Sequence, residues 1–172
     1  MGNGHIAYIK LEHGFAYLVA IMDWYSRYVI AWKLSPSLEM DFCLENLAAA
    51  LKAAHPTIHN SDQGSHFTSP RYTSILSEKE IQISMDGRGR CMDNIFTERL
   101  WRTVKYENVY LKSYGNFQEA NAGLKHYFHF YNHLRPHSSL ENQTPAQVYF
   151  KDQILGIAIG TTQSSTREKV IS

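Results

Sequence analysis

The sequence predicts one α/β domain, a five-stranded mixed sheet flanked by helices. Hydrophobic residues make up 44% and aromatic residues 13% of the 172 residues, so the chain can bury one substantial core. Runs rich in β-branched and aromatic residues are interleaved with runs that have helical spacing. We expect the domain to span residues 1–150 and residues 151–172, rich in Gly, Ser and Thr, to form a flexible tail.

The first third of the chain predicts three strands and a helix. The strands are rich in Val, Ile, Tyr and Trp and are separated by turn-forming residues. They span Ile6–Lys10, Ala16–Asp23 and Tyr28–Leu34. Apolar residues at helical spacing then predict a helix over Glu39–Ala54, which Pro56 ends.

The middle of the chain predicts a strand–helix–strand pattern. A fourth strand runs over Thr57–Asp62, a helix starts near Pro70, and a short fifth strand spans Ile81–Met85. The segment Asp86–Met92 contains two glycines and two arginines, so we expect a mobile loop without a bound partner.

The remaining chain predicts helices. One covers Asp93–Lys105, a capping box at Asn116–Glu119 opens another that ends near Asn132, and Thr144–Pro145 opens a last short one. Three strands, a helix, a strand, a helix, a strand and then helices is the order of a ribonuclease H-like fold.

Charge and cysteine content limit the location and partners. The net charge of +1 is weak for a nucleic-acid binder, yet six Lys or Arg stand against three acids between Arg88 and Lys112. Cys43 and Cys91 lack metal-ligand spacing and are expected to be reduced thiols. No run is apolar enough to cross a membrane, so we expect a cytoplasmic protein without a membrane partner.

Asp62 and Glu98 are the leading candidates for a metal site. A strand-end Asp and a helix-borne Glu that face each other across one pocket would supply the oxygen ligands that hard divalent cations prefer. Two such ions can activate a water or hydroxyl and stabilise the leaving oxygen of a phosphodiester. The structural alternatives are a turn role for Asp62 and a helix pair between Glu98 and Arg102 on a solvated face.

Helical spacing assigns two faces to the helix that carries Glu98. At about 100° per residue, the carboxylate shares its side with polar or basic neighbours and one Trp, namely Asn94, Trp101, Arg102 and Lys105. The opposite side is expected to face the core through Phe96, Leu100, Thr103 and Val104.

Several motifs occur together in one order. They are Met22–Arg27, Asn60–Ser69, Gly87–Asn94 leading to Glu98, Lys105 seven residues later, and Phe130–His137. In this combination the chain resembles the DDE transposases of bacterial insertion sequences, which share the catalytic core of retroviral integrases. The resemblance runs from about His5 to Phe150. It implies DNA cleavage and strand transfer in transposition, with Asp62 and Glu98 as catalytic metal ligands for Mg²⁺ or Mn²⁺.

The resemblance also exposes a departure at the first catalytic carboxylate. In the family this Asp lies on the first strand in a Thr-Asp-Ile-Thr-Tyr-Ile-like motif, and the matching stretch here is Gly4–Ile9, so His5 occupies its position. An imidazole carries no negative charge and suits Mg²⁺ poorly, so we expect weakened metal binding and impaired activity. Asp23 matches a different family position, and we expect it to order the Ser26–Arg27 corner.

The resemblance further implies DNA contacts and assembly. Four basic side chains are expected to hold phosphates, namely Arg88, Arg90, Arg102 and Lys105. A homodimer or a higher multimer is expected. No end-recognition segment precedes the first strand, which suggests a fragment or an internal start. The alternatives are a catalytically dead DNA-binding or dimerising remnant and, less well matched, a ribonuclease acting on RNA–DNA hybrids.

Three histidines share one face of the predicted helix that ends near Asn132. His126, His129 and His133 have spacing that permits a zinc site, although a fourth ligand would have to come from elsewhere. The alternative is a polar or phosphate-contacting surface.

Overall fold

An antiparallel meander forms the first part of the structure. The computed structural model describes residues 6–85, 95–158 and 170–171. Strand β1 (Ile6–Lys10) pairs with β2 (Phe15–Met22), which pairs with β3 (Val29–Ser35), and a register shift falls between Ile21 and Met22. The three predicted strands are thereby confirmed, with ends displaced by one residue at most.

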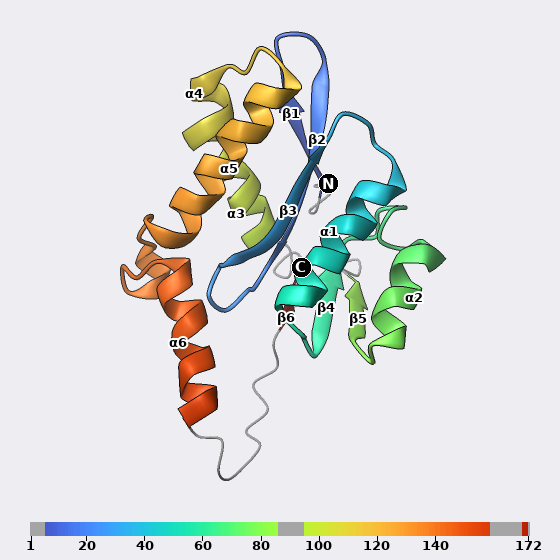
Figure 1. Ribbon diagram of the computed structural model, residues 1–172, viewed down its shortest axis with the longest axis vertical. Helices are drawn as coiled ribbons and strands as arrows, with labels where there is room; N and C mark the ends of the chain where they lie inside the picture. The colour runs from blue at the N-terminus through green and yellow to red at the C-terminus, as the bar shows by residue number, and fades with distance from the viewer. Residues whose placement is uncertain (1–5, 86–94, 159–169, 172) are drawn as a thin grey trace.

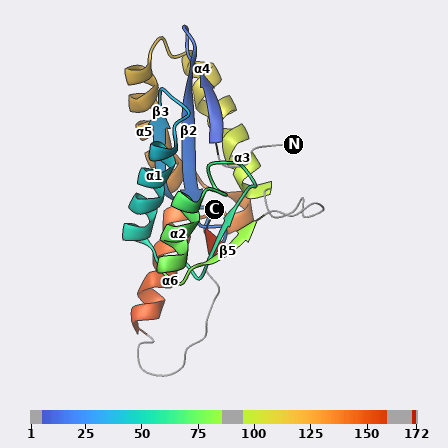
Figure 2. The ribbon, with the colours of Figure 1, turned by 90° about the vertical axis from the view of Figure 1, so that its right-hand side faces the viewer.

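A strand–helix–strand unit follows the meander. Helix α1 (Met40–Ala53) leads to β4 (Ile58–Ser61), and α2 (Pro70–Glu78) connects β4 to the parallel strand β5 (Gln82–Met85). Ser69 caps α2 by accepting the backbone N–H of Arg71, and Pro70 occupies the first helical position. In Figure 1, α1, β4, β5 and α2 lie together on the right of β3, and in Figure 2 α2 and β5 face the viewer.

Helices make up most of the second half of the described chain. Helix α3 (Ile95–Val104) continues without a break into the π-helix η1 (Lys105–Val109) and the short α4 (Tyr110–Lys112). Helix α5 (Phe117–His133), the 3₁₀ turn η2 (Ser138–Leu140) and α6 (Pro145–Ala158) complete this part. No helix among the described ranges combines the length and apolar character that crossing a bilayer requires.

Two of the predicted helices differ from expectation in detail. Asn116 caps α5 as predicted, because its side-chain oxygen accepts the backbone N–H of Glu119. The carboxylate of Glu119 accepts bonds from the backbone N–H of Gly115 and the side-chain NH₂ of Asn116, whereas a standard capping box uses the backbone N–H of Asn116. Helix α6 was expected to be short, and it runs for 14 residues to Ala158.

The prediction of a single five-stranded mixed sheet is wrong for the described residues. They form two three-stranded sheets, an antiparallel β1-β2-β3 and a parallel β5-β4-β6. Strand β6 (Val170–Ile171) comes from the segment expected to be a tail and pairs with Ile58 and His59 of β4. Because a strand has only two edges, β5 on one side and β6 on the other occupy this part of β4.

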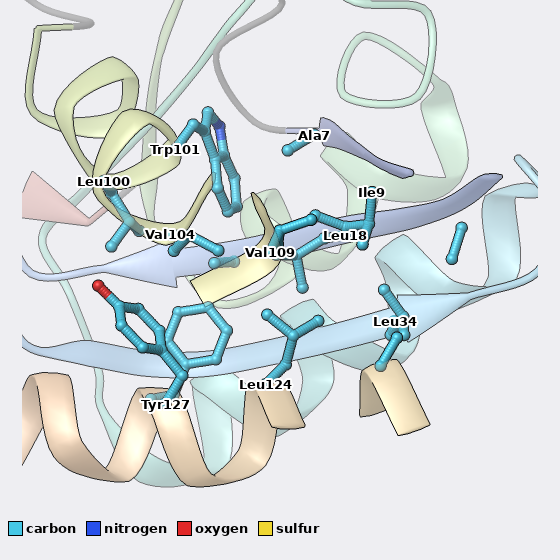
Figure 3. Close-up of a cluster of buried hydrophobic side chains, with 14 of the residues drawn as sticks. Ala7, Ile9, Leu18, Leu34, Leu100, Trp101, Val104, Val109, Leu124 and Tyr127 are labelled. Carbon is cyan, nitrogen blue, oxygen red and sulfur yellow. The ribbon is translucent and has the colours of Figure 1, made fainter. Parts of the chain in front are cut away.

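Hydrophobic clusters cover both faces of the meander. Period-2 alternation sends Leu18 and Ala20 to one cluster and Val19 and Ile21 to the other. Helices α3 and α5 cover the first face, and α1 and α2 lie on the other side (Figure 1). Figure 3 shows the first cluster, where side chains of α3, η1 and α5 pack against strand residues such as Ile9 of β1. The helix residues are Leu100, Trp101, Val104, Val109 and Leu124.

A buried asparagine ties α5 to the start of β3. The side-chain oxygen of Asn132 accepts the backbone N–H of Val29, and its side-chain NH₂ donates to the carbonyl of Val29, both at 2.9 Å. This pair of bonds has the pattern that a neighbouring strand would supply, so one side chain satisfies a buried stretch of backbone.

Candidate active site

Asp62 was predicted to be the last residue of the fourth strand; β4 ends one residue earlier, at Ser61, and the backbone fixes the carboxylate of Asp62. The residue is 7% exposed, and its Oδ1 accepts the backbone N–H of Gly64 at 2.7 Å. A Cβ on Gly64 would lie 2.7 Å from that same Oδ1 and 3.5 Å from the ring of Phe67. Glycine at this position therefore allows the turn that holds the Asp62 carboxylate.

Buried polar side chains lie close to Asp62. The hydroxyl of Tyr72 and Nε2 of His59 are 3.1 Å apart, and both residues are almost fully buried. Burial raises the pKa of the Cys43 thiol to about 12, and the nearby charge of Asp62 adds to this shift. Burial raises the pKa of Tyr72 in the same way. Cys43 and Tyr72 are therefore neutral at physiological pH, and Cys43 is a free thiol.

A small cavity of about 120 Å³ opens beside Asp62. Strand β1 contributes Ile6 and Tyr8 to its wall, and the loop after β4 contributes Ser65, His66 and Phe67. The carboxyl end of β4 and the start of β1 therefore meet at this cavity. Glu98 is not part of its lining, so the facing of the two carboxylates across one pocket stays a prediction.

Glu98 lies in the first turn of α3 and is exposed to solvent. A carboxylate in the first turn of a helix interacts favourably with the helix dipole. The packing of the buried face of α3 against the core positions this side chain. The buried residues of α3 are Thr97, Leu100, Trp101 and Val104, which have the i, i+3, i+4, i+7 spacing of one face.

The predicted faces of this helix are partly wrong. Trp101 was expected beside Glu98, but it is 7% exposed and belongs to the core cluster. Phe96 was expected in the core; it is only partly buried, packed against the same cluster, where its ring contacts Trp24 and its ring centre lies 3.3 Å from the guanidinium carbon of Arg27. The large indole gains more from burial than a residue that can pair with a cation at the surface.

The structure describes two of the four predicted phosphate-binding residues. Arg102 is exposed, and its guanidinium carbon lies 5.9 Å from the centre of the Tyr106 ring. Lys105 is partly exposed at the first position of η1. Arg88 and Arg90 lie outside the described residues, as do His5 and the Asp86–Met92 loop.

Asp23 has the structural role that the sequence predicts. Its Oδ2 accepts the backbone N–H of Ser26 at 2.9 Å and the Ser26 hydroxyl at 2.5 Å. Its backbone carbonyl accepts the N–H of Arg27, which has a positive φ of 63°. Asp23 therefore holds the β2–β3 corner, and both of its carboxylate-bonded groups come from one turn.

Sequence reasoning missed a polar network between η1 and α5. Arg135 donates to both carboxylate oxygens of Glu107, from Nε at 2.9 Å and from Nη2 at 2.6 Å, and the Tyr127 hydroxyl donates to Oε2 at 2.9 Å. These bonds, with Arg135 first, lower the pKa of Glu107. Burial and the neighbouring Arg135 lower the pKa of His137 to about 4.

A signal for this network was present in the sequence. The Phe130–His137 motif contains Asn132, Arg135 and His137, all of which make buried or partly buried polar contacts. The motif was identified by resemblance, but Val29 and Glu107, the partners of Asn132 and Arg135, are too distant in the chain for spacing to indicate them.

The described residues contain no group of three or more His, Cys, Asp or Glu that could hold a metal ion. The rings of His129 and His133 lie 4.8 Å apart, centre to centre, on one face of α5. The zinc interpretation of the three histidines gains no support from these positions.

Comparisons with known proteins agree with this fold. One integrase core domain model matches residues 4–91, about half of the chain, and a second matches residues 79–145. Among solved structures, the catalytic core domain of BIV integrase superposes with a TM-score of 0.67 at 13% identity, over 91% of this chain and 99% of that one. The HTLV-2 integrase catalytic core domain gives 0.61 at 21% identity, over 84% and 91%. These similarities show the fold.

Curated relatives are closer in sequence. The transposase for insertion sequence element IS629 of Shigella sonnei is 32% identical over 81% of this chain and 48% of its own length. The putative transposase InsK for IS150 of Escherichia coli is 33% identical over 76% and 47%. The chain thus spans about half the length of these relatives. It belongs to the integrase core domain family and groups there with the DDE transposases of bacterial insertion sequences.

Proposed function

We propose that this chain is a transposase catalytic core that acts on DNA in the cytoplasm, with Asp62 and Glu98 as ligands for a divalent metal. One observation carries the proposal. The two integrase core matches together run from residue 4 to residue 145, a range that contains His5, Asp62 and Glu98. The HTLV-2 integrase core, which shares the fold, was solved in complex with magnesium.

Asp62 and Glu98 are ligands of the right chemical type for such an ion, but they supply two carboxylates where the family has three. Asp62 and Glu98 offer carboxylate oxygens, the ligands that Mg²⁺ prefers, and Asp62 borders a cavity next to β1. When bound, the metal supplies charge stabilisation at the phosphodiester and activates the attacking oxygen. His5 brings an uncharged nitrogen to the third position, so we infer that metal binding is weak and activity impaired.

The chain's own residues have distinct tasks in this proposal. The Gly64 N–H orients the Asp62 carboxylate, and the core beneath α3 sets the position of Glu98. Arg102 and Lys105, four and seven residues after Glu98, hold phosphates next to the site, and Arg88 and Arg90 add charge. DNA is the expected partner, and the chain acts as a homodimer or a higher multimer. The HTLV-2 core was solved in dimeric and trimeric forms.

Metal titration by calorimetry tests the site directly. With Mn²⁺ as the probe, His5→Asp should raise affinity by about tenfold or more, because a third charged oxygen ligand is restored. Asp62→Asn and Glu98→Gln should each abolish the binding that remains. Asp41→Asn is a matched control, since this exposed acid pairs with Arg71 on α2. Equal affinities for all five proteins would overturn the metal assignment.

Strand transfer tests the impairment. A pre-nicked transposon-end duplex isolates the joining step, and we expect little joining with Mg²⁺ by the unaltered chain and more by His5→Asp. If both proteins join DNA equally well, the impairment is refuted.

His5 also favours a second candidate, a catalytically dead DNA-binding or dimerising remnant. That function would be supported if His5→Asp binds DNA but shows no gain in metal affinity or joining.

A further inference from the structure

A row of exposed side chains runs along the segment α3–η1–α4. Glu98, Arg102, Tyr106 and Tyr110 recur every four residues, and the two tyrosines are 64% and 53% exposed. The Arg102 guanidinium carbon lies 5.9 Å from the Tyr106 ring centre, and the Tyr106 and Tyr110 ring centres lie 5.3 Å apart at an interplanar angle of 88°. The row thus begins at the proposed metal ligand and ends in two large aromatic rings in contact.

The π-helix keeps this row straight. In an α-helix with 3.6 residues per turn, each step of four residues drifts by about 40° around the axis, so three steps would carry Tyr110 to another face. Residues 105–109 instead form a π-helix, whose wider turns reverse part of this drift. Val109, which lies between the two tyrosines in the chain, stays in the core (Figure 3).

The segment that carries the two rings has more basic than acidic residues. Arg99, Arg102, Lys105 and Lys112 belong to this segment, and its acids are Glu98 and Glu107. Both oxygens of Glu107 accept bonds from Arg135, which follows α5, so that carboxylate is neutralised locally. A solvent-facing aromatic pair among cations matches the chemistry of single-stranded nucleic acid, which offers base faces and phosphates together.

We propose that Tyr106 and Tyr110 form a stacking platform for unpaired DNA, with Arg102 and Lys105 binding its phosphates on the side nearer Glu98. Base faces in a duplex are already covered by their neighbours, so ring stacking selects a strand that is unpaired there. The inference rests on the proposed function for the identity of the nucleic acid. Binding to the platform requires neither the metal nor a third carboxylate.

Fluorescence anisotropy of the full chain with fluorescein-labelled oligothymidine tests the platform, in EDTA and at low salt. Tyr106→Leu with Tyr110→Leu should weaken single-strand binding by roughly tenfold or more, because stacking on both rings is lost. Tyr106→Phe with Tyr110→Phe keeps the rings and should stay within about twofold. Tyr25→Leu removes a tyrosine of similar exposure, 61%, from the β2–β3 corner and should have no effect.

A hairpin duplex of the same length separates stacking from general charge attraction. Its affinity should change by less than about twofold in the leucine pair. An equal loss for duplex and single strand, or no loss for either, would overturn the platform. So would a leucine pair that shifts the particle mass in light scattering, because the two rings would then belong to a contact between copies of the chain.

The outcome is separable from that of the proposed function. The DNA-binding assay contains EDTA, so its result does not depend on metal binding. If the chain binds no Mn²⁺, the metal site is refuted, and the platform is not affected. A chain that binds Mn²⁺ but no single strand would refute the platform alone.

Discussion

The two proposed metal ligands are held in place by different means. Asp62 is 7% exposed, and a backbone N–H two residues away fixes its carboxylate. Glu98 is exposed, and its position depends on the opposite face of α3, where Leu100, Trp101 and Val104 pack into a core shared with α5 and the meander. One ligand is positioned by a local turn and the other by tertiary packing. Substitutions that disturb them should therefore act over different distances.

The largest effect should come from the core beneath Glu98. Trp101→Ala removes a large buried side chain from the packing of α3, and we expect the free energy of unfolding to fall by about 3–5 kcal/mol. Urea denaturation followed by circular dichroism measures this change. Glu98→Gln on the exposed face should shift stability by less than about 0.5 kcal/mol. Comparable losses for the two variants would contradict the division of α3 into a packed face and an exposed face.

A smaller effect should follow at the local turn of Asp62. Gly64→Ala places a methyl group 2.7 Å from Asp62 Oδ1, so the carboxylate must move and lose the bond from the Gly64 N–H. We expect stability to fall by about 1–2 kcal/mol and Mn²⁺ affinity to fall with it. Ser65→Ala, the adjacent residue in the cavity wall, is the control and should change neither quantity. An unchanged Mn²⁺ affinity in Gly64→Ala would show that the turn does not position the carboxylate.

The smallest effect should be a pH dependence in the network that joins η1 to α5. The pKa of His137 falls from 6.5 to about 4 in the folded protein, so between these values the unfolded chain binds more protons. Stability should therefore decline as the pH drops from about 6.5 to 4, by an amount on the order of 1 kcal/mol after solvent screening. Urea midpoints at pH 7 and pH 5 measure the decline.

His137→Gln should remove this part of the decline, while the exposed His126→Gln should retain it. The charged side chains that act on the pKa of His137 are Arg135, Glu107 and Arg27. Below the ordinary pKa of Glu107 a further loss is expected, because that carboxylate is stabilised in its charged form by Arg135. A His137→Gln variant with the full decline would place the acid sensitivity elsewhere.

The contrast between local turns and tertiary packing also explains which features could be predicted from the sequence. Strand β1 has the predicted ends, and β4 ends only one residue before the predicted Asp62, because alternation and turn residues are local signals. The face of α3 was misassigned at Trp101 and Phe96, since spacing alone does not state which side of a helix meets the core. The π-helix after Val104 and the bond between Arg135 and Glu107 depend on neighbours far along the chain. The prediction of strand pairing was wrong because it also depends on distant segments: β6, near the other end of the chain, pairs with β4.

The asparagine that completes β3 has a consequence for biosynthesis. Val29 and Asn132 are 103 residues apart in the chain, so the meander cannot complete its buried hydrogen bonds when its own strands leave the ribosome. At roughly 5–20 residues per second, translation needs about 5 to 20 s to bring Asn132 into reach. During that interval the face that α3 and α5 later cover is exposed apolar surface. The nascent chain should therefore be a client for chaperones until α5 has been synthesised.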